Sequence, residues 1–276
     1  MKLILLPIYL LSLSVFSQES GIILYHEKTN LEKEKEQISK SLDSSINEDP
    51  EAAQLMEMIS SQLQGALSTL GNKDMELSFN KDAQLYKKQE ITADNIPQEN
   101  NIDFQMTFVS SKGQNEEIYV NTKKPELITS TDFMGRTFLI KENPTTLKWK
   151  IKGAQKSILG HPCILAETKK ENQTIEAWFT SQIPHSVGPK GIYGLPGAIL
   201  EVIIYEKDSI SNSFEEKLTI TATQVDLNAE KLKIKKPKKG KQLRSMSEFK
   251  EIVNERLKED EAMGKGKTTI EIKTER

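Results

Sequence analysis

Apolar and polar residues alternate along much of the chain, in short runs separated by turn residues. Such alternation is typical of strands with one face on a core and the other in water. The predicted strands cover residues 21–30, 75–79, 83–86, 102–109, 117–120, 126–129, 137–140, 147–151, 163–166, 174–179, 198–205 and 217–225. The pattern therefore predicts an α+β, mostly β fold built on one large antiparallel meander.

A second pattern, with apolar residues three and four apart, runs from Pro50 to Leu70. This spacing is typical of an amphipathic helix, and Asp49-Pro50 and Gly71-Asn72 suit its two ends. We expect this helix to lay its apolar stripe on the sheet. The charged run from Glu32 to Glu36, by contrast, is predicted to be a solvated connector.

Near the C-terminus, Ser245-Met-Ser-Glu248 matches a capping box and predicts a helix over residues 245–263. The lysine-rich segment 233–244 before it is predicted to be a basic linker, and the polar residues 264–276 to be a mobile tail. The linker could attract an acidic polymer or an anionic lipid, but its shortness favours a solvated connector.

The first 17 residues have the pattern of a secretory signal peptide, with one basic residue, an apolar run from Leu3 to Leu11, and small residues at Val15 and Ser17. Since a helix needs about 20 apolar residues to span a bilayer, cleavage before Gln18 is favoured over an uncleaved anchor. We therefore predict an exported protein, periplasmic, extracellular or associated with the cell envelope, with residues 18–232 as its β-rich domain.

Composition and charge exclude some kinds of partner and some kinds of site. The chain has 38 basic and 40 acidic residues, a net charge of −2, which argues against nucleic acid as a partner. Cys163 is the only cysteine, so an intramolecular disulfide is excluded. The histidines at positions 26, 161 and 185 lack the spacing of metal ligands, and we expect neither a metal nor a cofactor.

The most distinctive segment is a loop that follows Trp178 and leads into an almost entirely apolar strand ending at Tyr205. Its glycines and prolines are Pro184, Gly188, Pro189, Gly191, Gly194, Pro196 and Gly197. Glycines in such a loop indicate backbone that turns through positive φ or passes very close to another group. We expect the prolines to hold the start of the strand rigid, and Gly197 to need positive φ.

His161, Cys163 and His185 are the residues from which a site with a thiol and an imidazole could be built. A nucleophilic cysteine needs a base within hydrogen-bonding reach and a lowered pKa. Because Cys163 is followed by Ile-Leu-Ala, a buried, inert thiol is the favoured interpretation. A secreted hydrolase that uses Cys163, His185 or Glu201 stays open as an alternative.

Glu201 interrupts the apolar run 198–204. A buried carboxylate needs a partner, which Arg136 or Lys190 could supply. We interpret Glu201 as a structural anchor and not as a catalytic acid. Trp178 and the other aromatic residues near the loop could line a ligand groove, but packing between the sheet and its helix is favoured.

Several short motifs, in their order and spacing, carry a family resemblance. They are Asp132-Phe-Met-Gly-Arg136, Lys148-Trp-Lys-Ile151, Ile158-Leu-Gly-His-Pro-Cys163, Ala177-Trp-Phe-Thr180, Gly188-Pro189 and Tyr193-Gly-Leu-Pro-Gly-Ala-Ile-Leu-Glu-Val202. On these residues the chain resembles the GLPGLI family of exported bacterial proteins. Its hallmark positions are Gly194, Leu195, Pro196 and Gly197, and Ala198 stands in place of the second leucine.

The resemblance covers most of the mature chain but implies no catalytic residue, substrate or cofactor, because none is established for the family. It places Cys163 at a core position. By analogy it suggests a curved antiparallel sheet, an open barrel like that of periplasmic lipoprotein carriers, which hold acyl chains in a concave groove.

We therefore predict a non-enzymatic periplasmic or cell-envelope protein that binds an apolar ligand or an outer-membrane protein. The alternatives are the secreted hydrolase and a structural accessory of an outer-membrane complex. A binder should have an apolar concavity, an enzyme two titratable groups in one cleft, and an accessory an exposed apolar patch.

Overall fold

The computed structural model describes most of the chain but not its ends. The described residues are 20–43, parts of 57–70, 71–90, 114–208, 211–227 and 232–262. The predicted signal peptide (1–17), the strand predicted at 102–109 and the predicted tail (264–276) lie outside them.

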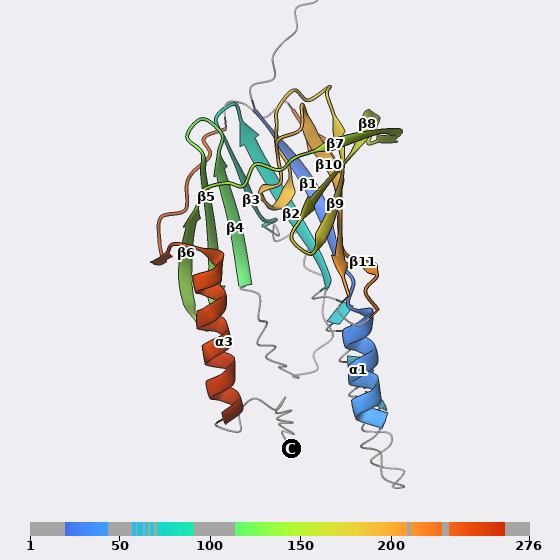
Figure 1. The fold of residues 1–276 in the computed structure, drawn as a ribbon. Coiled ribbons are helices and arrows are strands. Elements are labelled where there is room, and N and C mark those ends of the chain that lie inside the picture. The colour runs from blue at the N-terminus through green and yellow to red at the C-terminus, as the bar shows by residue number, and fades with distance from the viewer. Residues whose placement is uncertain are drawn as a thin grey trace, which may run out of the picture.

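One strongly curved sheet of 12 strands dominates the molecule (Figure 1). The strands are β1 (Ser20–Thr29), β2 (Asn72–Asn80), β3 (Ala83–Lys88), β4 (Gln114–Asn121), β5 (Glu126–Phe133), β6 (Arg136–Glu142), β7 (Lys150–Ile158), β8 (His161–Lys170), β9 (Gln173–Thr180), β10 (Ala198–Lys207), β11 (Phe214–Asp226) and β12 (Lys241–Leu243). Their order is β12-β6-β5-β4-β3-β2-β1-β11-β10-β9-β8-β7. The predicted large antiparallel sheet is confirmed, and β12 adds one parallel pair beside β6.

The main core lies on one face of this sheet. Along β1, alternate side chains are buried, including Ile23 and Tyr25. They belong to a single apolar cluster that also contains Val120 of β4 and Phe179 of β9. Since β4 and β9 are far apart in the strand order, the curvature of the sheet brings its two halves together around this core.

Helix α1 (Glu32–Asp43) occupies the segment predicted to be a solvated connector, so that prediction is wrong. The Asn30 side chain caps the helix by accepting a hydrogen bond from the backbone N–H of Glu32 at 3.1 Å. Ion pairs one turn apart, Glu32 with Lys35 and Glu36 with Lys40, support it. Long charged side chains favour helix once a cap is present, which the charge pattern alone did not reveal.

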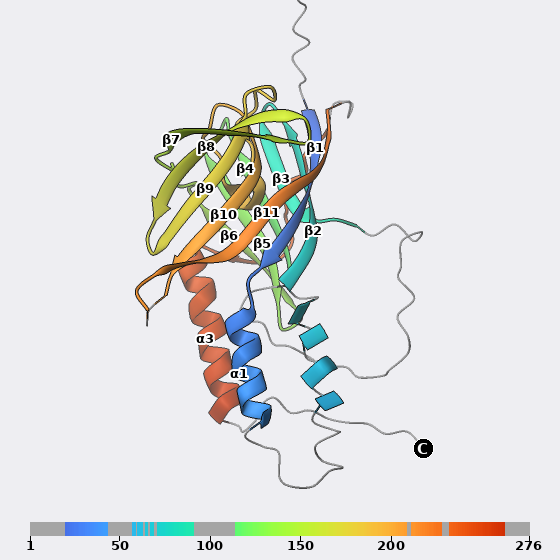
Figure 2. The same cartoon turned by 90° about the vertical axis from the view of Figure 1, so that its right-hand side faces the viewer.

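The described residues between 57 and 71 are helical, in agreement with the second predicted helix. Figure 2 shows these turns (cyan) beside α1, beyond the end of the sheet. Leu67 is buried, whereas Met58 is half exposed. The concave face of the sheet is covered instead by residues 181–197.

Helix α3 (Met246–Ala262) begins at the predicted capping box. The backbone N–H of Glu248 donates to Ser245 Oγ at 3.2 Å. Phe249 packs edge-on against Phe133 and Phe138 of the sheet, with ring centroids 6.1 and 5.4 Å apart. The helix is thereby fixed to the edge of the sheet at its first turns (Figure 1).

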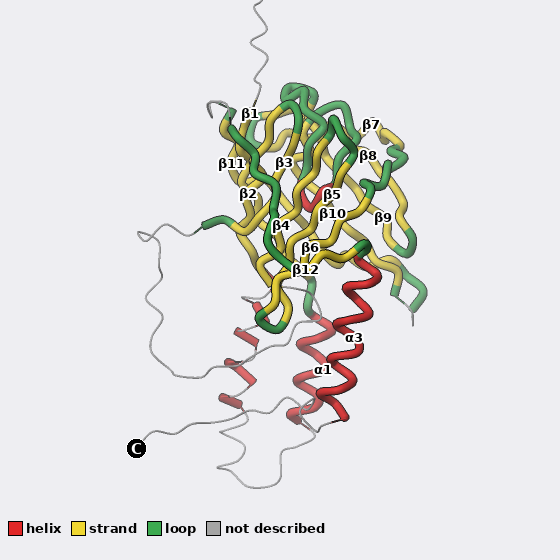
Figure 3. The backbone as a smooth tube through the Cα atoms, turned by 90° about the vertical axis from the view of Figure 1, so that its left-hand side faces the viewer, coloured by secondary structure: helices red, strands yellow, loops and turns green. Residues whose placement is uncertain are grey.

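Residues 232–240, which we call the basic strap, cross the sheet on the way to β12 (Figure 3). Ile234 packs with Tyr119 in a small cluster separate from the main core. Because neighbouring residues of β4 point to opposite faces, this cluster lies on the face away from the core. The predicted basic linker is thus a connection held to the sheet by Ile234, with Lys233, Lys235, Lys238 and Lys239 exposed, and it leads into the short strand β12.

Candidate functional site

The glycine-rich loop of residues 181–197, which we call the plug, folds back onto the concave face of the sheet. Its buried apolar side chains are Ile183, Val187, Pro189, Ile192 and Leu195. At its centre the short 3-10 turn η2 (Pro189–Gly191) contacts β3 and β4 (red in Figure 3). The loop that we expected to shape the rim of a groove therefore fills the concave face itself.

The plug glycines are needed for two different reasons. Gly191 and Gly194 have φ of +69° and +102°, which favour glycine. A Cβ atom on Gly197 would lie 2.0 Å from the carbonyl oxygen of Thr180, and one on Gly188 would lie 2.4 Å from that of Ile192. Gly197 does not have positive φ, so that prediction is wrong, and its need for glycine comes from close backbone packing instead.

A buried polar network lies beneath the tip of the plug. Lys190 Nζ is 3.0 Å from Glu116 Oε2 on β4 and 3.5 Å from Glu27 Oε1 on β1. Tyr86 of β3 donates its hydroxyl hydrogen to the same Glu27 oxygen at 2.6 Å. Tyr25 packs edge-on against Tyr86. The network therefore connects the plug with three strands of the sheet.

Lys190 has an uncommon backbone conformation and a shifted side-chain pKa. Its backbone lies in the left-handed region, with φ of 51° and ψ of 29°, which is uncommon for a residue with a side chain. Burial alone lowers the pKa of Lys190, but the carboxylates of Glu116 and Glu27 outweigh this effect and raise it. Burial, reinforced by Glu27, also raises the pKa of the Tyr86 hydroxyl. Lys190 is therefore charged while Tyr86 is neutral.

Further hydrogen bonds fix the two arms of the plug. The backbone N–H of Gly188 donates to Gln84 Oε1 at 3.0 Å, and Trp149 Nε1 donates to the carbonyl oxygen of Tyr193 at 3.1 Å. The remaining predicted motif residues of the loop, Pro184, Gly194 and Pro196, are exposed. Within the motif, Leu195, Gly188 and Gly197 are packed, whereas these three residues face the surface.

Cys163 is fully buried, and the rings of His161 and His185, the two residues that could activate it, contact other side chains. Its thiol donates to the carbonyl oxygen of His161 at 3.4 Å, and burial raises the pKa of the thiol to about 11. The ring of His161 contacts Gln182 Oε1 at 2.8 Å, and the ring of His185 packs against Phe79 with centroids 5.3 Å apart. A raised pKa is the opposite of what a nucleophilic thiol requires.

Glu201 is paired, but with neither of the predicted partners. Its carboxylate lies 2.5 Å from Lys156 Nζ, which also sits 4.3 Å from the centre of the Trp178 ring. Lys190 pairs with Glu27 and Glu116 instead, and Arg136 is exposed at the start of β6. The register of β10 and β9 places Glu201 opposite Trp178, and Lys156 lies over the Trp178 ring, so the lysine and the carboxylate meet there.

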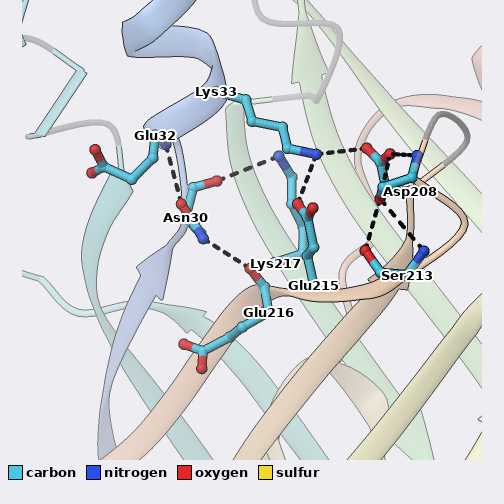
Figure 4. Close-up of polar contacts among 9 residues, drawn as sticks. Asn30, Glu32, Lys33, Asp208, Ser213, Glu215, Glu216 and Lys217 are labelled. Carbon is cyan, nitrogen blue, oxygen red and sulfur yellow. Dashed lines mark hydrogen bonds and ion pairs between the residues drawn. The ribbon is translucent and has the colours of Figure 1, made fainter.

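A second group of ion pairs, which we call the clasp, joins the start of α1 to the β10–β11 hairpin (Figure 4). Lys33 Nζ lies 2.6 Å from Asp208 Oδ2 and 2.7 Å from Glu215 Oε2. Asn30 donates to the carbonyl oxygen of Glu216 at 3.1 Å. The hydrogen bonds to Asp208 and Glu215 raise the pKa of Lys33. The clasp borders a surface depression of about 330 Å³.

Sequence reasoning missed Glu27, the buried carboxylate of the network. The available signal was its place in the alternation of β1, where Ile23, Tyr25 and Glu27 fall on one face. A carboxylate on an otherwise apolar face predicts a buried partner. That the partner is Lys190, more than 160 residues later, could not be inferred from the pattern.

The described residues contain neither a helix suited to crossing a membrane nor a cluster of potential metal ligands. None of the helices in that part of the chain is long and apolar enough to cross a membrane. Within the same residues, no three His, Cys, Asp or Glu side chains gather in a way that could hold a metal ion.

Comparison with known proteins gives one family match and a distant structural likeness. Residues 152–201 match the Porph_ging family, described as a protein of unknown function. No curated protein matches the chain. Among solved structures, PNGF-II in the space groups C2 and P21 is 16% identical, with a TM-score of 0.46 and 85% of this chain covered. The chain spans about a third of the PNGF-II chain, of which 32% and 33% are covered.

Proposed function

We propose that this chain is an exported protein of the periplasm or cell envelope that works by binding and not by catalysis. The observation that carries the proposal is the plug. Because the chain's own loop occupies the concave face of the sheet, an apolar ligand would have to displace Leu195 and Ile192, which are buried there. We infer that partners bind on the outer surface.

Membership of the GLPGLI family is part of this proposal. The family match at residues 152–201 includes the hallmark residues Gly194 to Gly197 and supports it. Export rests on the pattern of residues 1–17, in which an apolar run is followed by small residues.

The surroundings of the candidate catalytic residues favour binding over hydrolysis. A hydrolase that uses Cys163 would need a thiol that ionises easily, whereas burial raises its pKa to about 11. Glu201 is held by Lys156, and such a pair has the character of a structural anchor.

Native mass spectrometry of the protein isolated from its own periplasm tests the proposal. We expect a chain that begins at Gln18 and carries a polar partner, which denaturation releases intact. Retention of residues 1–17 in a cytoplasmic fraction would contradict export. A reproducible acyl-containing adduct would show instead that the plug opens to admit an apolar ligand.

Replacing Cys163 by Ala tests the hydrolase alternative. We expect the folded wild-type protein to resist a thiol-modifying reagent at pH 8, because the thiol is buried and protonated there. The Cys163→Ala variant should complement a deletion strain as well as the wild type does. A variant with an unchanged melting temperature that fails to complement would favour the hydrolase.

A further inference from the structure

A surface depression of about 1100 Å³ lies on the outer surface near α3. Its lining comes from the β4–β5 turn, the end of β6, the basic strap and the residue two before α3. Its lining residues are Lys123, Lys124, Pro125, Glu126, Lys141, Glu142, Asn143, Lys236 and Arg244. Five of these are basic and two are acidic, so the depression carries an excess of positive charge.

Both carboxylates in the depression are already engaged by the protein. Glu126 lies 2.6 Å from Lys236 of the basic strap. Glu142 accepts a hydrogen bond from the backbone N–H of Met246, at the start of α3, at 2.9 Å. The charge of Lys123 is balanced by Asp82 at 2.7 Å.

Three cations are left without a carboxylate partner among the described residues: Lys124, Lys141 and Arg244. All three are exposed. Lys141 Nζ lies 3.4 Å from the amide oxygen of Gln242, which carries no charge. Their combined charge is therefore available to an anion from outside.

The fold holds the backbone of these cations in place. The N–H of Lys124 donates to Asn121 Oδ1 at 2.9 Å, and that of Arg244 donates to Glu248 Oε2 at 2.8 Å. Arg244 follows Leu243, which is buried against α3 and β6. Lys141 lies within β6 itself. Because the backbone is already fixed, the conformational cost of binding is confined to ordering the three side chains.

The lining also indicates the kind of partner. Among the described lining residues, Pro125 is the one apolar side chain, and none is aromatic. Protein interfaces usually have an aromatic and apolar centre, and amphipathic membrane-binding sites insert apolar side chains, so neither of these fits the lining. Glu126, Glu142 and Asn143 add acceptors for hydroxyl groups. A ligand with both anionic groups and hydroxyls would use the whole set.

We propose that this depression binds an acidic carbohydrate, a sugar chain that carries carboxylate or phosphate groups, through Lys124, Lys141 and Arg244. The inference rests on the proposed binding function and names the chemistry of its partner. The sugar's anionic groups pair with the three cations, and its hydroxyls donate to the carboxylates.

The test is a calorimetric titration of the full mature protein with a galacturonic acid hexamer. Maltohexaose is the uncharged probe. We expect the hexagalacturonate to bind and maltohexaose not to bind. Replacing all three residues by Ala should weaken binding by about 10-fold or more. Raising the salt concentration from about 50 to about 300 mM should weaken binding to the wild type.

The matched control is Lys148→Ala/Lys169→Ala/Lys170→Ala, which removes the same charge from exposed positions around β7 and β8. Equal loss in the two triple variants would overturn the site, as would failure of the wild type to bind. Tighter binding to phosphatidylglycerol vesicles than to the hexagalacturonate, lost in the same site variant, would overturn the carbohydrate assignment in favour of a lipid.

The same samples separate the two proposals. Mass spectrometry of the recovered hexagalacturonate should show an unchanged chain length. A shortened product would overturn binding without catalysis while leaving the site in place. A failed titration combined with a different polar partner in the native spectrum would overturn the site alone.

Discussion

The plug and helix α1 are each attached to the sheet through a lysine that lies between two carboxylates, yet the two attachments differ in burial. Lys190 reaches Glu27, whose side chain is 5% exposed, and Glu116. Lys33 reaches Asp208 and Glu215, but its own side chain is 55% exposed. The distances in the clasp are shorter, whereas the Lys190 side chain is only 25% exposed and Glu27 is the most buried of the four carboxylates.

The distance between the charged atoms is therefore a poor guide to how much an ion pair contributes to the free energy of unfolding. An exposed pair is screened by water and salt and contributes little to stability. In a buried pair, removal of one partner leaves a charge without compensation, which is costly. The plug also buries apolar side chains and fits glycines against backbone, whereas the clasp consists of polar contacts at one helix start.

The largest expected effect comes from replacing Lys190 by Ala. This change leaves Glu27 buried and without its cation, and the free energy of unfolding should fall by about 3 kcal/mol or more. Urea unfolding followed by circular dichroism measures the loss. The double variant Lys190→Ala/Glu27→Gln should recover part of it, because glutamine still accepts from Tyr86 and carries no charge.

Lys33→Ala is the matched control for this variant. Because the Lys33 side chain is exposed, we expect no measurable change in the urea midpoint. Equal losses in the two lysine variants would show that burial does not distinguish the attachments, and the comparison would fail.

A smaller effect is expected from Gly197→Ala, which tests the plug without altering a charge. The added methyl group would overlap the Thr180 carbonyl oxygen, so the backbone must shift, at a cost of about 1–3 kcal/mol. Thermal unfolding measures it. Gly65→Ala is the control, because an added Cβ there has no neighbour within 4 Å. A Gly197→Ala variant as stable as this control would contradict the observed close packing.

The smallest expected effect is on the pH dependence of stability. The folded-state pKa values of Lys190 and Tyr86 are raised, so both keep their protons after the unfolded chain has lost them. The unfolded state then binds fewer protons, and stability should fall as the pH rises above about 10. Below that pH, the contribution of both groups is fully present.

Urea unfolding between pH 8 and pH 11.5 measures this fall, and Tyr86→Phe should make it shallower because one of the two groups is removed. Added salt should leave the contribution of the plug largely intact, since buried charges are poorly screened. An identical pH profile in the wild type and in Tyr86→Phe would show that Tyr86 is not linked to folding.

Most strands could be predicted because their pattern is local. The runs at 174–179 and 198–205 alternate or are apolar throughout, and they form β9 and β10. The strand β12 could not be predicted, since Lys241 to Leu243 has no alternation and pairs with β6 through tertiary contacts. Helix α1 was missed because its cap, Asn30, lies within what resembled the end of a strand.

The candidate site was predictable only in part. The spacing of the plug glycines indicated turns and close packing, and both are present. The burial of Cys163 followed from the apolar residues after it. The partner of Glu201 did not follow from the sequence, because Lys156 lies on β7, and two strands, β8 and β9, separate β7 from β10 in the sheet.

The sequence by itself determined the mostly β class, the C-terminal helix with its cap, and the turns of the plug, since all three depend on residues close together in the chain. The tertiary structure alone decided that the plug covers the concave face, that Lys190 joins Glu27 and Glu116, and that Lys124, Lys141 and Arg244 share one depression. These contacts join distant residues, and the curvature and register of the sheet, which no local pattern encodes, bring them together.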